Sequence, residues 1–282
     1  MVSRRLILAS GLALASSACT QLAFLAANVS ASFGDYSQRR DLVYGPEPRH
    51  RLDVYLPPQP QGAPVLVFFH GGGWRSGDKD HYKFVGSALA ELGYIAVLPN
   101  YRLYPQVRFP DFVNDAALAV AWVRQRAASW VGDAPRLYLL GHSAGAHIAM
   151  MLALNAQYLA EVGMSTNTLR GVVGLAGPYD FLPFKYDYMR DLFGPEARYP
   201  ESQPIRYARA DAPPLFLLQG LRDNVVAPAN ATHLADALTA LGARVTVKLY
   251  PDANHGDLVA AFSIPARGRV PVLKDTQQFV DS

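Results

Sequence analysis

The sequence predicts an α/β fold, with a mostly parallel central sheet of about eight strands and helices on both faces. Three observations predict it. Short apolar segments alternate with longer amphipathic ones along most of the chain, which is the order of a parallel sheet with crossover helices. Residues 65–69 are apolar on both faces, as in a strand at the middle of a sheet. The 282 residues are half apolar and 17% charged, so a single domain with one large core is expected.

The elements follow from local patterns, taken in order along the chain. Residues 40–44 and 51–56 alternate apolar and polar side chains on either side of a Gly- and Pro-containing turn, which predicts two antiparallel strands. After the strand at 65–69, the patterns predict strands at 94–98, 137–140, 172–175, 215–219 and 245–250, and helices at about 81–92, 112–130, 144–154 and 231–241. The alternation stops at about 180–213. This stretch is longer than an ordinary connection, which predicts a small lid insertion or a substrate wall.

The first 18 residues have the pattern of a signal peptide. Arg4 and Arg5 precede an apolar run at 6–15, which is too short for a transmembrane helix, and small residues follow it. The first residues also resemble a twin-arginine export signal. The sequence therefore predicts an exported protein, with a linker at 19–39 and the α/β domain at 40–282.

The only cysteine, Cys19, directly follows the predicted signal peptide. It resembles the lipid-modified cysteine of bacterial lipoproteins, although Ser16 stands where that signal usually has Leu. Two interpretations follow, a membrane tether through Cys19 or an unmodified cysteine in the leader. We expect a periplasmic, secreted or lipid-anchored protein, and a single cysteine excludes an intrachain disulfide.

Charge and motif content exclude several functional classes. The net charge is +3 and the basic residues are scattered, so no nucleic-acid partner is expected. The sequence has no His-Glu-x-x-His motif, cysteine pair or carboxylate cluster with ligand spacing, so neither a metal nor a cofactor is expected. It does not specify an oligomeric state.

The candidate nucleophile is Ser143, in the sequence Gly-His-Ser-Ala-Gly at residues 141–145. This motif directly follows a predicted strand and precedes a predicted helix. A nucleophile in a tight strand-to-helix turn needs small neighbours, because its backbone is strained and its hydroxyl must stand clear of the sheet. Gly141 and Gly145 provide that space, and the strand and helix around the motif make an ordinary glycine-rich turn a poor alternative.

A second motif, His-Gly-Gly-Gly-Trp at residues 70–74, follows the buried strand at 65–69. Three consecutive glycines cost backbone entropy, which indicates that the backbone must approach a ligand closely. In acyl transfer that ligand is the oxyanion, and we expect the N–H groups of Gly72, Gly73 and Ala144 to stabilise it. A phosphate-binding loop does not fit, because the glycine spacing differs and no Gly-Lys-Ser/Thr follows.

The candidate base and acid follow later strands. In a sheet of this class the order along the chain is Ser, then Asp or Glu, then His, with each residue at the carboxyl end of a strand. Asp223 follows the strand at 215–219 and His255 follows the strand at 245–250. Asp180, which follows the strand at 172–175, is the stronger alternative acid, and Asp252 and Asp257 are weaker ones. We expect His50, His81, His142, His147 and His233 to be structural.

With these residues identified, the chain resembles the α/β-hydrolase superfamily from about residue 52 to 255. Within it, the chain resembles a carboxylesterase group that includes hormone-sensitive-lipase-like and feruloyl or acetyl esterases, isoprenylcysteine methylesterase and kynurenine formamidase. Besides the two glycine motifs, the resemblance rests on Asp53-Val54-Tyr55, Gly77 with Lys79, Asn100-Tyr101-Arg102-Leu103, Phe109-Pro110 and Asp115. The segment before Arg40 is too short for the large helical cap of the hormone-sensitive-lipase group.

This resemblance implies an α/β-hydrolase fold and a cofactor-independent serine carboxylesterase that acts on small-molecule esters with small or medium acyl groups. Ser143, His255 and Asp223 would form and hydrolyse an acyl-enzyme. The same site would also serve an arylformamidase or a lactonase. A prolyl-oligopeptidase-like peptidase is a weaker alternative, because the chain has no room for a propeller domain. A non-catalytic binding module is also weaker, because every catalytic element is present.

Overall fold

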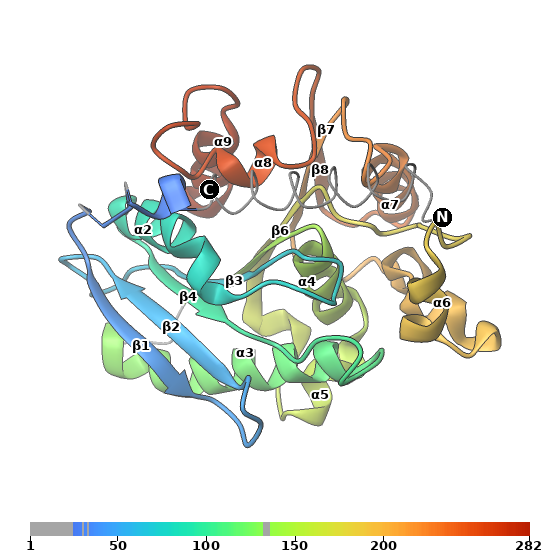
Figure 1. The fold of residues 1–282 in the computed structure, drawn as a ribbon, viewed down its shortest axis with the longest axis horizontal. Coiled ribbons are helices and arrows are strands. Elements are labelled where there is room, and N and C mark those ends of the chain that lie inside the picture. Colours follow the sequence, from blue (N-terminus) through green and yellow to red (C-terminus); the bar gives the residue numbers. More distant parts are fainter. Residues whose placement is uncertain (1–24, 30, 33, 132–135) are drawn as a thin grey trace, which may run out of the picture.

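The computed structural model describes residues 25–282 except residues 30, 33 and 132–135, so the predicted signal peptide and Cys19 lie outside the described residues. One eight-stranded sheet runs through the molecule in the order β1-β2-β4-β3-β5-β6-β7-β8 (Figure 1). The β1–β2 and β2–β4 pairs are antiparallel, and every other pair is parallel. This arrangement confirms the predicted fold class.

Each predicted strand is present, with small shifts at its ends. β1 begins at Ser37, inside the predicted linker, because it pairs with β2 from Ser37 opposite Leu56. β6 begins at Leu169, three residues early, because Leu169 already pairs with Leu137 of β5. The strands are β1 Ser37–Val43, β2 Arg51–Leu56, β3 Val65–Phe69, β4 Ile95–Pro99, β5 Leu137–His142, β6 Leu169–Leu175, β7 Leu215–Gly220 and β8 Val245–Tyr250.

The four predicted helices are present, and several short ones add to them. The α-helices are α2 Lys83–Glu91, α3 Asp111–Val131, α4 Ala144–Leu154, α5 Ala156–Glu161, α6 Asp187–Phe193, α7 Ala229–Ala240, α8 Asp257–Ala260 and α9 Val272–Asp281. The 3₁₀ helices are η1 Lys79–Tyr82, η2 Thr166–Thr168, η3 Glu196–Ser202 and η4 Pro204–Tyr207. The sequence patterns did not predict α5, α6, α8 and α9. Three of them have seven residues or fewer, too few for a clear helical period.

Helices cover both faces of the sheet (Figure 1). Side chains of α3, α4 and α7 pack in one apolar core, and those of α2, α8 and α9 pack in the other. β3 shows how the sheet divides them, because Val65, Val67 and Phe69 enter the first core and Leu66 and Phe68 the second. All five are buried, as expected for a strand with a helix layer on each side.

The parallel strands bring distant segments of the chain to one edge. Phe69 of β3 lies opposite Gly141 of β5, and Gly220 of β7 lies opposite Tyr250 of β8, so these four strands end at the same edge. The loops that follow them carry the predicted nucleophile, oxyanion donors, acid and base. None of the helices in the described part of the chain has the length and apolar character of a membrane span.

Candidate active site

Ser143 occupies a strained turn between β5 and α4. Its φ of 56° and ψ of −121° put it in a conformation that costs a non-glycine residue on the order of 1–3 kcal/mol. The neighbouring glycines are sterically required. A Cβ on Gly141 would lie 2.2 Å from the Gly145 carbonyl oxygen, and one on Gly145 would lie 2.0 Å from the carbonyl oxygen of Phe69. The two glycines that flank Ser143 in the motif are therefore required because the backbone packs directly against them.

The structure brings Ser143, His255 and Asp223 into one hydrogen-bonded line. His255 Nε2 lies 3.0 Å from Ser143 Oγ, and His255 Nδ1 lies 2.8 Å from Asp223 Oδ2. Because a carboxylate can only accept hydrogen bonds, His255 Nδ1 carries a proton and donates a hydrogen bond to Asp223. His255 Nε2 is then the acceptor for the Ser143 hydroxyl. This tautomer is the one that a general base requires.

Asp223 is fixed by more than its contact with His255. Its Oδ1 accepts hydrogen bonds from the backbone N–H groups of Val225 (2.8 Å) and Val226 (2.9 Å). The side-chain amide of Gln219 donates to Oδ2 over 3.0 Å. Burial alone would raise the pKa of Asp223, but the hydrogen bond and charge of His255 and the two N–H groups outweigh burial and lower that pKa. Asp223 therefore stays ionised at neutral pH.

The alternative acids have other partners. Asp180 Oδ2 lies 2.8 Å from Nδ1 of His233, which was expected to be a structural residue. Asp252 pairs with Arg222, and Asp257 Oδ2 accepts the backbone N–H of Asn254 over 2.9 Å. The geometry places only Asp223, among these four carboxylates, against the imidazole of His255.

Two residues that the sequence analysis did not assign to the site support it. Gln219 holds Asp223, and its signal was a polar residue near the end of an otherwise apolar strand. His142 Nε2 lies 3.0 Å from the backbone carbonyl oxygen of His255, so Nε2 is protonated and donates to it. The two imidazole centroids lie 4.9 Å apart, and burial lowers the pKa of His142 to about 3. His142 therefore fixes the base loop as a neutral group.

The loop that carries the predicted oxyanion donors is folded tightly on itself. The carbonyl of Gly72 accepts hydrogen bonds from the N–H groups of Arg75 (3.2 Å) and Ser76 (3.1 Å) and from the Ser76 hydroxyl (2.9 Å). Gly72 has a φ of 128°, and a Cβ there would lie 2.1 Å from the Ser76 carbonyl oxygen. Gly73 also has a positive φ, of 59°. Only glycine fits this path at Gly72, because the Ser76 carbonyl oxygen of the same loop occupies the space that a Cβ would need.

His70, the first residue of this motif, is a structural residue. Its ring lies between those of Tyr82 and Tyr101, with centroids 5.9 and 4.4 Å away. The Tyr101 hydroxyl donates to the His70 carbonyl oxygen over 2.8 Å, and burial lowers the pKa of His70 to about 4. A neutral, buried imidazole thus fixes the start of the loop.

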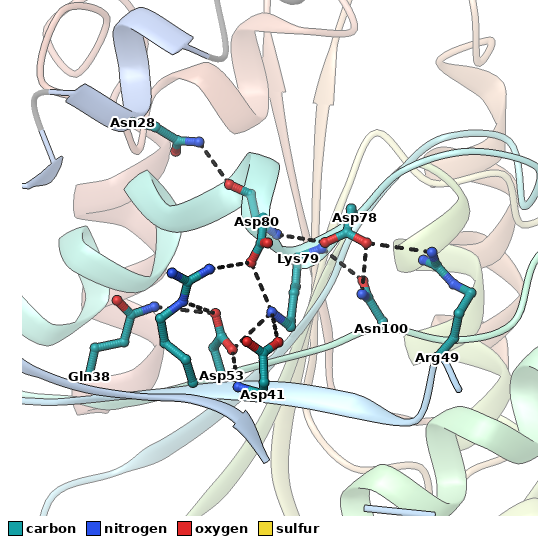
Figure 2. A network of polar contacts seen from close by, with 10 residues as sticks. Asn28, Gln38, Asp41, Arg49, Asp53, Asp78, Lys79, Asp80 and Asn100 are labelled. Carbon is teal, nitrogen blue, oxygen red and sulfur yellow. Dashed lines mark hydrogen bonds and ion pairs between the residues drawn. The ribbon is translucent and has the colours of Figure 1, made fainter. Parts of the chain in front are cut away.

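A polar network fixes the end of the same loop (Figure 2). Arg49 donates to the Gly77 carbonyl oxygen over 3.0 Å and forms an ion pair with Asp78. The Asn100 side chain accepts the Lys79 backbone N–H over 2.7 Å and donates to Asp78 over 2.9 Å. These contacts join the loop to the start of β2 and the end of β4. Asn100, Gly77 and Lys79 are among the residues that carried the resemblance.

Lys79 is the central cation of this network (Figure 2). Its Nζ lies 2.8 Å from Asp41, 3.0 Å from Asp53 and 2.8 Å from Asp80, and its side chain is 2% exposed. Burial opposes its charge, but the hydrogen bonds to the three carboxylates outweigh burial and raise the pKa of Lys79. The buried charge is therefore compensated, as such a charge must be.

A cavity of about 530 Å³ opens beside Ser143 and His255 and is also lined by Gly72 and Gly73. Its other walls include several residues between 178 and 189 and residues 225–227, so part of the predicted insertion faces the site. The insertion is held by ring packing, since Phe193 contacts Trp74 edge-on with centroids 4.9 Å apart. Among the described residues, no three His, Cys, Asp or Glu side chains gather as a metal site would require.

Comparison with known proteins gives a consistent assignment. The model of the BD-FAE family matches residues 52–238. A probable isoprenylcysteine alpha-carbonyl methylesterase of Arabidopsis thaliana is 34% identical over 244 residues, which cover 78% of this chain and 57% of that protein. Esterase LipC of Mycobacterium tuberculosis is 32% identical over 244 residues, covering 78% of this chain and 60% of that protein. The chain thus spans less than two thirds of the length of these relatives.

A solved structure shows the same fold. Esterase B from Lactobacillus rhamnosis superposes with a TM-score of 0.77 at 22% identity, covering 96% of this chain and 95% of that chain. At this identity the likeness concerns the fold, which is the α/β-hydrolase fold that the resemblance implied.

The acid assignment predicts different effects for two carboxylates. Asp223→Asn should lower kcat for p-nitrophenyl acetate by about 10³–10⁴-fold, because the amide favours the wrong tautomer of His255. Asp180→Asn should lose far less, because Asp180 is paired with His233. Steady-state kinetics of both purified variants test this. A larger loss in Asp180→Asn than in Asp223→Asn would show that the acid is Asp180.

The network around Lys79 predicts that Lys79 and Arg40, which contact some of the same carboxylates, contribute very different amounts to the free energy of unfolding. Lys79→Met should lower the free energy of unfolding by about 3–5 kcal/mol, because it removes the buried cation that compensates the charge of buried Asp53. Arg40→Met is the matched control. Arg40 also contacts Asp53 and Asp80 but is 57% exposed, so the loss should be about 0–1 kcal/mol. Urea denaturation of both variants measures this, and equal losses would contradict it.

Proposed function

This chain belongs to the BD-FAE family, and on that premise we propose that it is a serine carboxylesterase for esters with small or medium acyl groups. The observation that carries the proposal is the continuous hydrogen-bonded line from Ser143 through His255 to Asp223, beside an open cavity. The relatives reported above are named as esterases, which supports the same reaction class.

In the first half of the proposed reaction, His255 Nε2 takes the proton of the Ser143 hydroxyl as Oγ attacks the ester carbonyl carbon. The carbonyl oxygen becomes an oxyanion, and the backbone N–H groups of Gly72, Gly73 and Ala144 stabilise it. The tetrahedral intermediate then collapses. The bond to the leaving oxygen breaks, and that oxygen takes the proton from His255 and departs as the alcohol.

In the second half, water replaces the alcohol. His255 takes a proton from water, the resulting hydroxide oxygen attacks the acyl carbon, and the same N–H groups hold the second oxyanion. The bond to Ser143 Oγ breaks, Ser143 regains its proton from His255, and the carboxylic acid leaves. Asp223 stays ionised throughout and stabilises the imidazolium that forms in each half.

The decisive test is removal of the nucleophile. Ser143→Ala should lower kcat/KM for p-nitrophenyl acetate by about 10³-fold or more, because no acyl-enzyme can form. Ser165→Ala, an exposed serine that caps η2, is the matched control and should keep the wild-type rate. A fluorophosphonate probe should label the wild-type protein and the Ser165 variant but not the Ser143 variant. Full turnover by Ser143→Ala would end the proposal.

We also propose that the chain is exported and tethered to a membrane. The support is the pattern of Arg4 and Arg5, the apolar run at 6–15 and Cys19 directly after small residues. Expressed in a bacterial host, the protein should lose residues 1–18, carry a lipid on Cys19 and separate with the membrane fraction. The Cys19→Ser variant should instead be found in the soluble fraction. Mass spectrometry of the mature N-terminus checks both steps, and an unmodified Cys19 in the exported protein would overturn the tether.

A further inference from the structure

A second cavity adjoins the first. It has a volume of about 630 Å³ and is bounded by residues 26–27, Phe84, residues 254, 256 and 257, and several residues between 259 and 269. Val259, Ala260 and Ala266 give its wall an apolar character. The catalytic cavity and this second cavity share two lining residues, Tyr82 and His142.

Three polar residues in the wall of the second cavity are engaged within their own loop, and a fourth, Arg269, is an exposed residue. Asn254 accepts the Gly256 N–H over 2.9 Å, and Asp257 accepts the Asn254 N–H over 2.9 Å. The Ser263 hydroxyl donates to the Ala260 carbonyl oxygen over 2.7 Å. The exposed Arg269 can keep its guanidinium in solvent, and the rest of the wall is mainly apolar, so an alkyl chain fits there better than a polar group.

Tyr82 is held as a rigid partition. Its ring lies 5.4 Å from Phe68, 5.9 Å from His70 and 6.0 Å from Phe84, measured between centroids, and it is 5% exposed. Its hydroxyl also interacts with the backbone of Gly71, in the loop that carries the predicted oxyanion donors. His142, the other shared residue, is held by its contact with the His255 carbonyl. A substrate chain directed at this side of Ser143 therefore meets a fixed wall.

We propose that Tyr82 determines chain-length specificity by closing the second cavity to the apolar chain of the ester. This inference rests on the proposed esterase function and names the substrate class: esters whose chain on the Tyr82 side is short. Removal of the Tyr82 ring joins the two cavities and creates a site for a long alkyl chain. An ester has an acyl chain and an alcohol chain, and either can be an alkyl chain. The test therefore uses one series of esters that varies the acyl chain and another that varies the alcohol chain.

The experiment measures kcat/KM for p-nitrophenyl esters from acetate to decanoate and for alkyl acetates from ethyl to octyl. In Tyr82→Ala, the ratio of octanoate to acetate, or of octyl to ethyl acetate, should rise by about tenfold or more, because each buried methylene adds binding in the transition state. The series that responds identifies the chain that faces Tyr82. The ratio of long-chain to short-chain kcat/KM cancels any general loss of activity that the missing contact with Gly71 causes, because such a loss affects both substrates equally.

Two variants make the result specific. Tyr82→Phe keeps the ring and loses only the hydroxyl, so its ratios should match the wild type. Adding Ala260→Phe to Tyr82→Ala refills the second cavity and should return the ratio to the wild-type value. If Tyr82→Ala fails to fold, as urea denaturation will show, Tyr82→Leu gives the same test, because leucine is shorter than the ring.

The outcomes separate this inference from the proposed function. Wild-type hydrolysis of p-nitrophenyl acetate that is lost in Ser143→Ala supports the esterase, whatever Tyr82 does. With that activity present, unchanged ratios in both series for Tyr82→Ala or Tyr82→Leu would overturn the role of Tyr82. An increase that Ala260→Phe fails to reverse would also overturn it, because the long chain would then occupy another place.

Discussion

The geometry of the site depends on one backbone contact, between the start of α4 and the end of β3. Gly145 lies so close to the carbonyl groups of Phe69 and His70 that any Cβ would fall 2.0 and 2.6 Å from them. This contact fixes the turn that carries Ser143 against the loop that carries Gly72. Nucleophile and oxyanion donors therefore keep their relative positions through main-chain packing, which side-chain motion cannot loosen.

The residues around this contact act as its support. Asp53, Lys79 and Asn100 have no place in the proposed chemistry, yet their contacts join η1 to β2 and β4. The ion pair of Lys79 and Asp53 is almost fully buried, so its geometry is sharply defined, because displacing either group would leave the other without its buried counter-ion. The loop at 70–78 is consequently held at both ends, by His70 with Tyr101 and by this network.

The sequence predicted the sheet and the line of site residues well, for a physical reason. Apolar strands and the order of strand ends along the chain are local signals, and parallel pairing brings those ends together. The partners of individual polar groups are not local. Nothing near Asp180 in sequence indicated that it pairs with His233, which comes from α7, and nothing near His142 indicated that it faces the carbonyl of His255. The short α6 and α8 were missed because tertiary packing, rather than periodicity, stabilises them.

His142 shows why such a contact matters to the chemistry. In the proposed mechanism a positive charge forms on His255 during each half of the reaction, with the ring of His142 4.9 Å away. A charged His142 would oppose that step, since like charges at this distance disfavour one another. Burial lowers the pKa of His142 to about 3, so it remains neutral while its Nε2–H still donates to the His255 carbonyl. One histidine thus orients the other without competing for its proton, and the same residue lines both the catalytic cavity and the second cavity.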